Sequence, residues 1–190
     1  MSTSNPDYVI DLALLAAGGR TADASAVEAD VLVLFDRCAP SLLRYASSFG
    51  LTADESEDVV QDVFLSLFKH LRMGRPQSNL KGWLFQVAHN LALRHRRRMR
   101  RRAGGPWNQA AAEQRADPSP DPEARLHGAE RRRRMQSVIH ALPERDRRCL
   151  QLRAEGLRYR EIASTLGISL GAVAKSLTRS IARLVGASGG

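Results

Sequence analysis

The sequence predicts an all-α protein made of two small helical domains joined by a flexible linker. Apolar residues recur at intervals of three and four, the spacing of one helix face, and few segments alternate with the period of a strand. A length of 190 residues suits two small domains. A stretch rich in proline, glycine and aspartate separates two helical blocks, and we place the linker there. The predicted divisions are an extension over residues 1–28, a domain over 29–102, a linker over 103–129 and a domain over 130–186.

The first block should begin with a helix whose apolar side includes Val31, Phe35 and Leu42. Pro40 lies inside this pattern. Proline removes a backbone donor and clashes with the preceding turn of a helix, so we expect Pro40 to kink or split it.

The second helix of this block has the clearest start signal in the chain. Thr52 and Glu55 form the pattern of a capping box, in which each side chain bonds the other residue's backbone amide. An apolar stripe then faces the predicted core. It consists of Val60, Val63, Phe64, Leu67, Phe68 and Leu71. The opposite face carries Asp54, Asp58, Gln61, Asp62 and Leu65, which suggests either a partner surface or the commoner solvated acidic face.

Gly and Pro content predicts a loop over residues 72–79, followed by a third helix from Leu80 to Arg102. Gln86, Asn90, Arg94 and Arg97 share one face of this helix. It ends with seven arginines within nine residues, 94–102. Such a run repels itself strongly unless an anion lies nearby.

Net charge and cysteine content narrow the classes of protein and partner. The 29 Lys+Arg against 20 Asp+Glu give a formal charge of +9, which favours a polyanionic partner, either nucleic acid or an acidic membrane surface. Cys38 and Cys149 stand far apart, and we expect two reduced core thiols in the cytoplasm. The apolar stretch 9–17 is too short to span a membrane and contains Asp11, so we expect no membrane insertion.

Residues 159–173 have the pattern of a helix-turn-helix. Ala163 is small where the helices would cross, and Gly167 permits a left-handed turn. Ser169 is placed to cap the second helix, and Gly171 would let the start of that helix approach DNA. The wedge between the helices would be filled by Ile162, Leu166, Ile168 and Val173.

Three segments in this order resemble the sigma factors of bacterial RNA polymerase, specifically the extracytoplasmic-function (ECF) group. Residues 54–65 resemble the polymerase-binding helix of that family. Residues 80–93, with the arginine run, resemble its −10 recognition and melting segment. Residues 141–150 and the helix-turn-helix resemble its −35 reading domain. The sequence departs from the family at Arg158, where a serine or threonine commonly caps the first helix of the motif, and at Ala174 and Ser176, where basic residues are usual.

The resemblance implies partners and site residues. The partners would be core RNA polymerase, through its β′ clamp and β flap, promoter DNA and an anti-sigma factor. The polymerase-binding residues would be Asp58, Gln61, Asp62 and Leu65. The −10 DNA contacts would come from Asn79, Trp83, Gln86, Asn90, Arg94, Arg97 and Arg98. The −35 DNA contacts would come from Ser169, Gly171, Ala172, Lys175, Ser176 and Arg179.

Two other classes of protein remain open at this point. A conventional helix-turn-helix regulator would bind duplex DNA without polymerase, and only the acidic helix and the tryptophan-containing segment argue against it. An enzyme acting on DNA would need a clustered nucleophile or metal-binding carboxylates. The acidic residues instead share one helix face and the histidines form no ligand motif, so we expect no catalysis, no metal and no cofactor.

Overall fold

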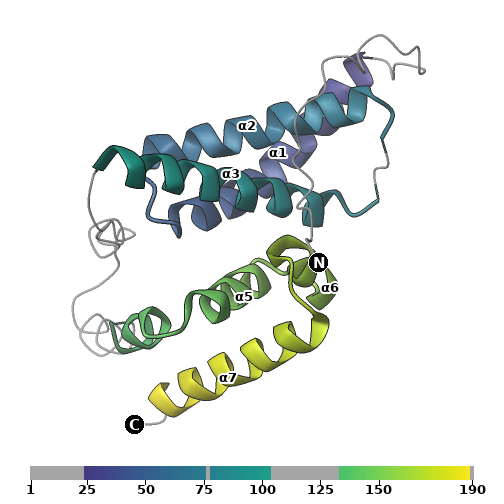
Figure 1. Cartoon of the computed structure of the whole chain (residues 1–190). Coiled ribbons are helices and arrows are strands. Elements are labelled where there is room, and N and C mark those ends of the chain that lie inside the picture. Colours follow the sequence, from purple (N-terminus) through teal and green to yellow (C-terminus); the bar gives the residue numbers. More distant parts are fainter. Residues whose placement is uncertain (1–23, 76–77, 104–132, 189–190) are drawn as a thin grey trace, which may run out of the picture.

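The computed structural model describes residues 24–75, 78–103 and 133–188, and all of the regular structure in these ranges is helical (Figure 1). The helices are α1 (Ala24–Ser47), α2 (Ala53–Arg72), α3 (Leu80–Ala103), α5 (Glu144–Ala154), α6 (Tyr159–Leu166) and α7 (Leu170–Ser188). A further helical segment covers residues 133–140. The predicted all-α fold with two helical domains is confirmed, whereas most of the expected linker, 104–129, lies outside the described residues.

The first domain consists of α1, α2 and α3, which pack on one another around a shared apolar core. Helix α1 begins ahead of residue 29, where the first domain was expected to start, because Val27 already lies in the core with 3% of its surface exposed. The helix continues across Pro40, so the expected split does not occur.

Helix α2 begins with the capping box that the sequence predicts. The Glu55 amide donates to the Thr52 hydroxyl at 3.2 Å, and the Thr52 amide donates to the Glu55 carboxylate at 2.8 Å. Two backbone donors that have no partner in the helix are thereby satisfied. The apolar stripe that follows packs against α1 and α3, with Val63 and Leu67 fully buried. The cap and the stripe fix which face of α2 is turned outward.

The second domain contains the expected helix-turn-helix, formed by α6 and α7. Gly167 ends α6 in the left-handed conformation, with φ 64° and ψ 36°. The Ala172 amide donates to the Ser169 hydroxyl at 3.2 Å, so Ser169 caps α7 as predicted. Ile162 and Val173 are fully buried between the helices.

An ion pair between a buried carboxylate and a partly exposed guanidinium fastens α7 to α5 inside this domain. Asp146 is fully buried, and its two carboxylate oxygens accept from Arg179 at 2.8 and 3.0 Å. The hydrogen bond from Arg179 is the main reason why the pKa of the Asp146 carboxyl lies below its ordinary value. The bidentate geometry sets the rotation of α7 relative to α5.

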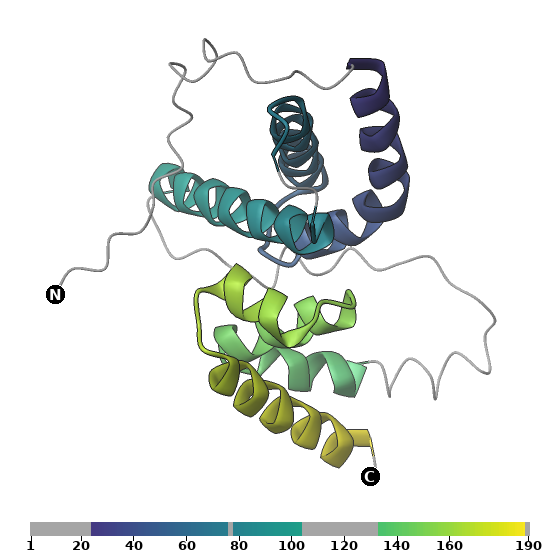
Figure 2. The same ribbon diagram turned by 90° about the vertical axis from the view of Figure 1, so that its right-hand side faces the viewer.

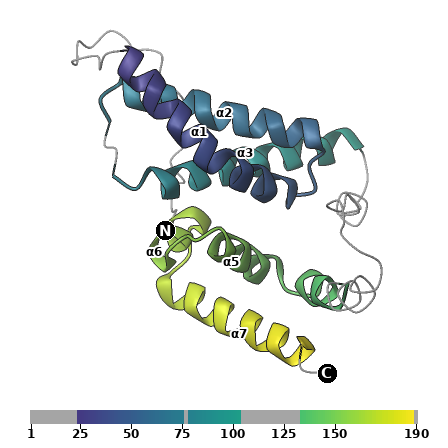
Figure 3. The same ribbon diagram turned by 180° about the vertical axis from the view of Figure 1, so that it is seen from behind.

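The two domains are docked, with α5 and α6 between α3 and α7 (Figures 1 and 2). Seen from behind, α1 also lies against the second domain (Figure 3). The buried apolar residues of both domains form one continuous cluster. Among the described residues, no helix is long and apolar enough to cross a membrane.

Candidate nucleic-acid interface

The outward face of α2 presents the acidic residues that the sequence singles out. Asp58, Gln61 and Asp62 are exposed, and Leu65 beside them has 53% of its surface exposed. Val59, Val63 and the other buried residues of α2 point into the core. The four exposed residues therefore share the opposite side of the helix. The result is an acidic surface with an exposed leucine.

Asn79 lies at the start of α3 in the left-handed region, with φ 60°. Its side-chain oxygen accepts from the Gly82 amide at 3.3 Å, so it caps α3. A Cβ on Gly82 would lie 2.6 Å from the Asn79 amide nitrogen, so a larger residue at this position would require the Asn79 side chain to move. The side chain expected to contact a base is therefore occupied in ordering the helix start.

The remaining residues expected to contact −10 DNA lie along α3, and their side chains become more exposed toward the end of the helix. Trp83 is half-buried, and the centre of its ring lies 4.6 Å from the centre of the His70 ring on α2. Gln86 and Asn90 are also half-buried, one and two turns further along. Arg94, Arg97 and Arg98 are exposed. A hollow of about 390 Å³ near the end of the helix is lined by Leu91, Arg94, His95, Arg97, Arg98 and Arg101.

The arginine run does not form a uniform surface. Arg96 turns toward the second domain, where it forms an ion pair with Glu144 of α5 and its guanidinium lies 5.7 Å from the centre of the Phe49 ring. Its neighbours Arg97 and Arg98 point to solvent. One arginine thus joins the domains, while others on the helix line the hollow.

Most of the residues expected to contact −35 DNA lie at the surface near the start of α7. Ser169, Gly171 and Lys175 are exposed at the start of α7, and Ala172 is half-buried. A Cβ on Gly171 would meet nothing within 4 Å, so the surface above it is open.

Of the other expected −35 residues, one is buried and one is held in an ion pair at the surface. The expectation for Ser176 is wrong in this conformation, because its side chain is fully buried on the side of α7 that packs on α5. Arg179 is held by the Asp146 carboxylate. Helical period alone could have raised doubt about Ser176, since it follows the buried Val173 by three positions.

Sequence reasoning missed a polar network between the domains. Arg148 of α5 is 3% exposed, and its guanidinium lies 3.5 Å from the centre of the Phe49 ring. The same group donates to the Ser48 carbonyl at 3.2 Å and to the Ser48 hydroxyl at 2.7 Å. Burial lowers the pKa of Arg148 to about 10. Charged residues on a short helix normally indicate a solvated face, so no sequence signal marked this arginine as buried.

His89 of α3 lies beside this network. It is hydrogen-bonded through Nδ1 to the Tyr45 hydroxyl at 2.8 Å, and its ring contacts Phe49 edge-on. Burial is the main cause that lowers the pKa of His89 to about 4, with the positive charges of Arg148 and Arg96 adding to the effect. His89 is therefore neutral at physiological pH in this arrangement. No metal-binding cluster of His, Cys, Asp or Glu occurs in the described part of the chain.

Family comparisons agree with the order of these segments. The model of Sigma-70 region 2 matches residues 34–102, and the model of Sigma-70, region 4 matches residues 132–184. The ECF RNA polymerase sigma factor SigL of Mycobacterium tuberculosis is 30% identical over 162 residues, which cover 83% of this chain and 89% of SigL. The RNA polymerase sigma factor CnrH of Cupriavidus metallidurans is 30% identical over 150 residues, covering 76% and 78% of the two chains.

Other relatives are longer than the region they share with this chain. The probable RNA polymerase sigma factor RfaY of Xanthomonas campestris is 35% identical over 138 residues, which cover 70% of this chain and 34% of RfaY. The aligned region likewise spans 54% of the ECF sigma factor SigE of Mycolicibacterium smegmatis.

Solved structures share the fold. CnrH in complex with the cytosolic domain of CnrY superposes with a TM-score of 0.55 at 26% identity, covering 86% of this chain and 90% of that chain. The sigma factor RpoE of Bartonella quintana, solved with the anti-sigma factor NepR, gives a TM-score of 0.64 at 22% identity, covering 83% and 96%.

The two matches to sigma regions define this protein as a sigma factor. Their order along the chain agrees with the order of the acidic helix, the arginine-rich helix and the helix-turn-helix. The chain belongs to the ECF family of RNA polymerase sigma factors.

Proposed function

We propose that this protein directs core RNA polymerase to specific promoters and promotes the initiation of transcription, without catalysing a reaction itself. The observation that carries the proposal is the presence on one chain of an acidic outward helix, an arginine-rich helix and a helix-turn-helix, within matches to both sigma regions. A conventional regulator would need only the last of these. The working compartment would be the cytoplasm, where the polymerase and promoter DNA meet.

The acidic face of α2 is the proposed site for core polymerase. Asp58, Asp62 and Leu65 would dock on a basic helical hairpin of the β′ clamp, with Gln61 between them. Charge complementarity would steer the encounter, and Leu65 would supply apolar contact at the centre. The exposure of all four side chains supports this assignment. The second domain would contact the β flap.

Helix α3 is the proposed −10 element. Gln86 and Asn90 would contact bases of the opened strand, while Arg94, Arg97 and Arg98 would bind phosphates along the exposed end of the helix. Trp83 would stack at the upstream edge of the melted bases if it swings from His70. Asn79 would position the start of α3, with any base contact requiring it to release Gly82.

The start of α7 is the proposed −35 element. Ser169, Gly171, Ala172 and Lys175 would lie in the major groove, as the first residues of a recognition helix do. Arg179 would act mainly by holding α7 on α5 through Asp146. An anti-sigma protein is a further proposed partner, because the related CnrH has been solved with the cytosolic domain of CnrY.

Run-off transcription tests the proposal. Purified protein and core polymerase should yield discrete transcripts from a subset of genomic promoter fragments, whereas either component alone should yield none. If no fragment is transcribed above the level given by core polymerase alone, the proposed function fails. Replacing Lys175 with alanine should reduce transcription by weakening −35 contact, without reducing binding to core polymerase.

A further inference from the structure

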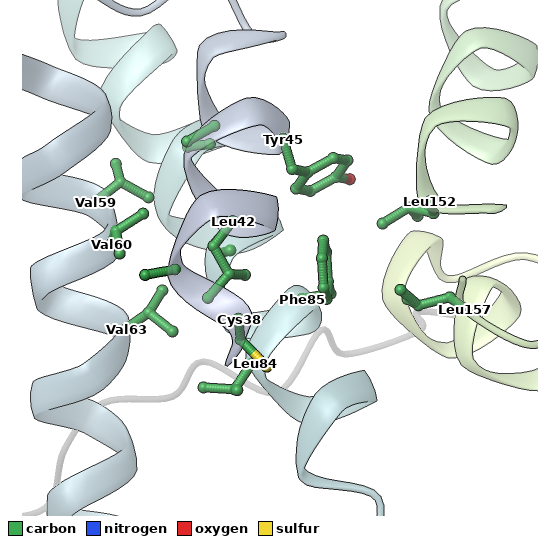
Figure 4. Packing of buried hydrophobic residues seen from close by; sticks show 14 of the residues in the cluster. Cys38, Leu42, Tyr45, Val59, Val60, Val63, Leu84, Phe85, Leu152 and Leu157 are labelled. Atoms are coloured by element: carbon green, nitrogen blue, oxygen red, sulfur yellow. The ribbon is translucent and has the colours of Figure 1, made fainter. Parts of the chain in front are cut away.

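Helix α1 has two apolar sides, and the described helices cover one of them. The covered side faces α2 and α3, and Figure 4 shows Cys38 and Leu42 of α1 pointing toward Val63 of α2 and Leu84 of α3. The first half of α1 lies at the edge of the domain, with α2 and α3 on the same side of it (Figure 2). The other side of this half is open among the residues that the structure describes.

Five consecutive apolar residues, 31–35, make more than one full turn of this half of α1. Phe35 lies against Phe64 of α2, with ring centres 4.9 Å apart. Leu32 and Val33 lie on the open side, with 64% and 50% of their surfaces exposed. A helix that is apolar all round is normally covered all round, so a further element is expected on the open side.

The exposed apolar residues on this side form a stripe. Ala29, Leu32 and Val33 are all exposed, and they follow the i, i+3, i+4 spacing of a helix face that packs on another element. Single apolar side chains at a surface are ordinary, whereas contiguous ones mark a contact. We call Ala29, Leu32 and Val33 the open stripe.

An apolar segment of matching length precedes α1 in the sequence. Nine of the ten residues 8–17 are apolar, and Asp11 is the exception. Six residues, 18–23, connect this segment to Ala24, the first residue of α1. Transfer of so many apolar side chains out of water is favourable, so the segment and the open stripe each gain from covering the other.

The connection is long enough for the segment to turn back along α1. The seven steps from Ala17 to Ala24 span at most about 23 Å when extended. The centre of the open stripe lies about 11 Å along the helix from Ala24, because a helix rises about 1.5 Å per residue. Packed helices lie about 8–10 Å apart, so the connection reaches the stripe with length to spare. The segment can therefore run antiparallel to α1 along the whole open stripe.

We propose that residues 8–17 pack on the open stripe of α1 and form a fourth element of the first domain. The extension ahead of α1 then covers the apolar edge that α2 and α3 leave open. This inference goes beyond the proposed function, because the contact forms within the free chain and involves neither DNA nor polymerase.

Alkylation of a cysteine placed in the open stripe tests the proposal. The two native cysteines are buried, so Val33→Cys supplies a distinct reactive thiol. Iodoacetamide should modify this thiol slowly in the otherwise wild-type chain. Adding Leu12→Glu and Leu15→Glu, which place two charges in the apolar segment, should speed the reaction by about tenfold or more, since a covered side chain reacts only when its contact opens.

Matched variants separate coverage of the stripe from a general effect of charge. Ser2→Glu with Ser4→Glu adds the same charge ahead of the segment and should leave the Val33→Cys reaction slow. A thiol at Thr178→Cys, exposed on α7, should react quickly and at the same rate whether or not the segment carries the two glutamates.

The reciprocal experiment places the thiol in the segment itself. Ala13→Cys should react slowly, and Leu32→Glu on the open stripe should speed that reaction. Because Leu32 is 64% exposed, its replacement leaves the core of the domain intact. Circular dichroism of each variant should show that the helices are retained, so that a faster reaction reports loss of the contact.

Three results would overturn the proposal. Alkylation of Val33→Cys as fast as that of Thr178→Cys in the otherwise wild-type chain would mean that the stripe is open in the free protein and available to another protein. Slow alkylation that speeds up on dilution would assign the cover to a second copy of the chain. Rates unchanged by both the glutamates in the segment and Leu32→Glu would show that the segment and the stripe do not touch.

Discussion

Reversing the charge of Asp58 and Asp62 should weaken binding to core polymerase. Both carboxylates are exposed, so each contact with a basic partner is worth about 0.2–1 kcal/mol. Replacement by lysine turns each attraction into a repulsion of similar size, and the pair together should cost about 1–4 kcal/mol. That range corresponds to a loss of affinity between roughly fivefold and several hundred-fold.

The assay is titration of fluorescently labelled protein with core polymerase at low and at moderate salt. The loss should shrink as salt increases, because exposed charges are screened. Glu28→Lys with Asp30→Lys makes the same change in net charge on the exposed part of α1, and it serves as the matched control. Unchanged affinity in the Asp58/Asp62 variant, or an equal loss in the control, would refute the assignment of the α2 face to polymerase.

Three further predictions concern the cap, the buried histidine and the arginine-rich helix. Thr52→Ala should lower the free energy of unfolding by about 1 kcal/mol in urea denaturation, because the Glu55 amide loses its acceptor; Thr52→Ser should restore most of it. The pKa of His89 is about 4 here against an ordinary value of 6.5, so neutral His89 favours the folded, docked form above pH 6.5. This contribution should be lost as the pH falls from 6.5 toward 4. The urea midpoint of the wild type should therefore fall over this range, and that of His89→Gln should fall less. Arg97→Ala should weaken binding of single-stranded DNA for all sequences alike and reduce its salt dependence, as measured by filter binding.

Each of these has an outcome that would contradict it. A stability for Thr52→Ala equal to that of the wild type would mean that the cap contributes nothing. The same pH dependence in wild type and His89→Gln would assign the titration to other groups. A loss confined to one DNA sequence in Arg97→Ala would indicate base contact instead of phosphate contact.

Local features of the fold could be predicted because short segments determine them. The capping box at Thr52 and Glu55 involves residues three positions apart, and both hydrogen bonds form. Gly167 and Ser169 likewise act within one turn of their own position, as the left-handed cap and the cap of α7. Helical periodicity also identified the outward face of α2, since the opposite face is apolar and buried.

Contacts between distant segments could not be predicted in the same way. Arg148 is a charged residue in a charged helix, and burial of such a residue depends on Phe49 and Ser48, a hundred positions away in the chain. Asp146 is a buried partner of Arg179, so this expected −35 residue is engaged in an ion pair although its side chain stays partly exposed. In each case the side chain's neighbours come from tertiary packing, which residue type and periodicity do not encode.

The most direct test of the central claim is the affinity of the purified protein for intact promoter duplex, measured in physiological salt with and without core polymerase. A sigma factor whose two domains are docked, with a single duplex-reading helix, should bind weakly and with little sequence preference when alone. Adding core polymerase should produce tight binding that depends on both promoter elements. Tight, sequence-specific binding to intact duplex by the protein alone would contradict the account and favour a conventional helix-turn-helix regulator.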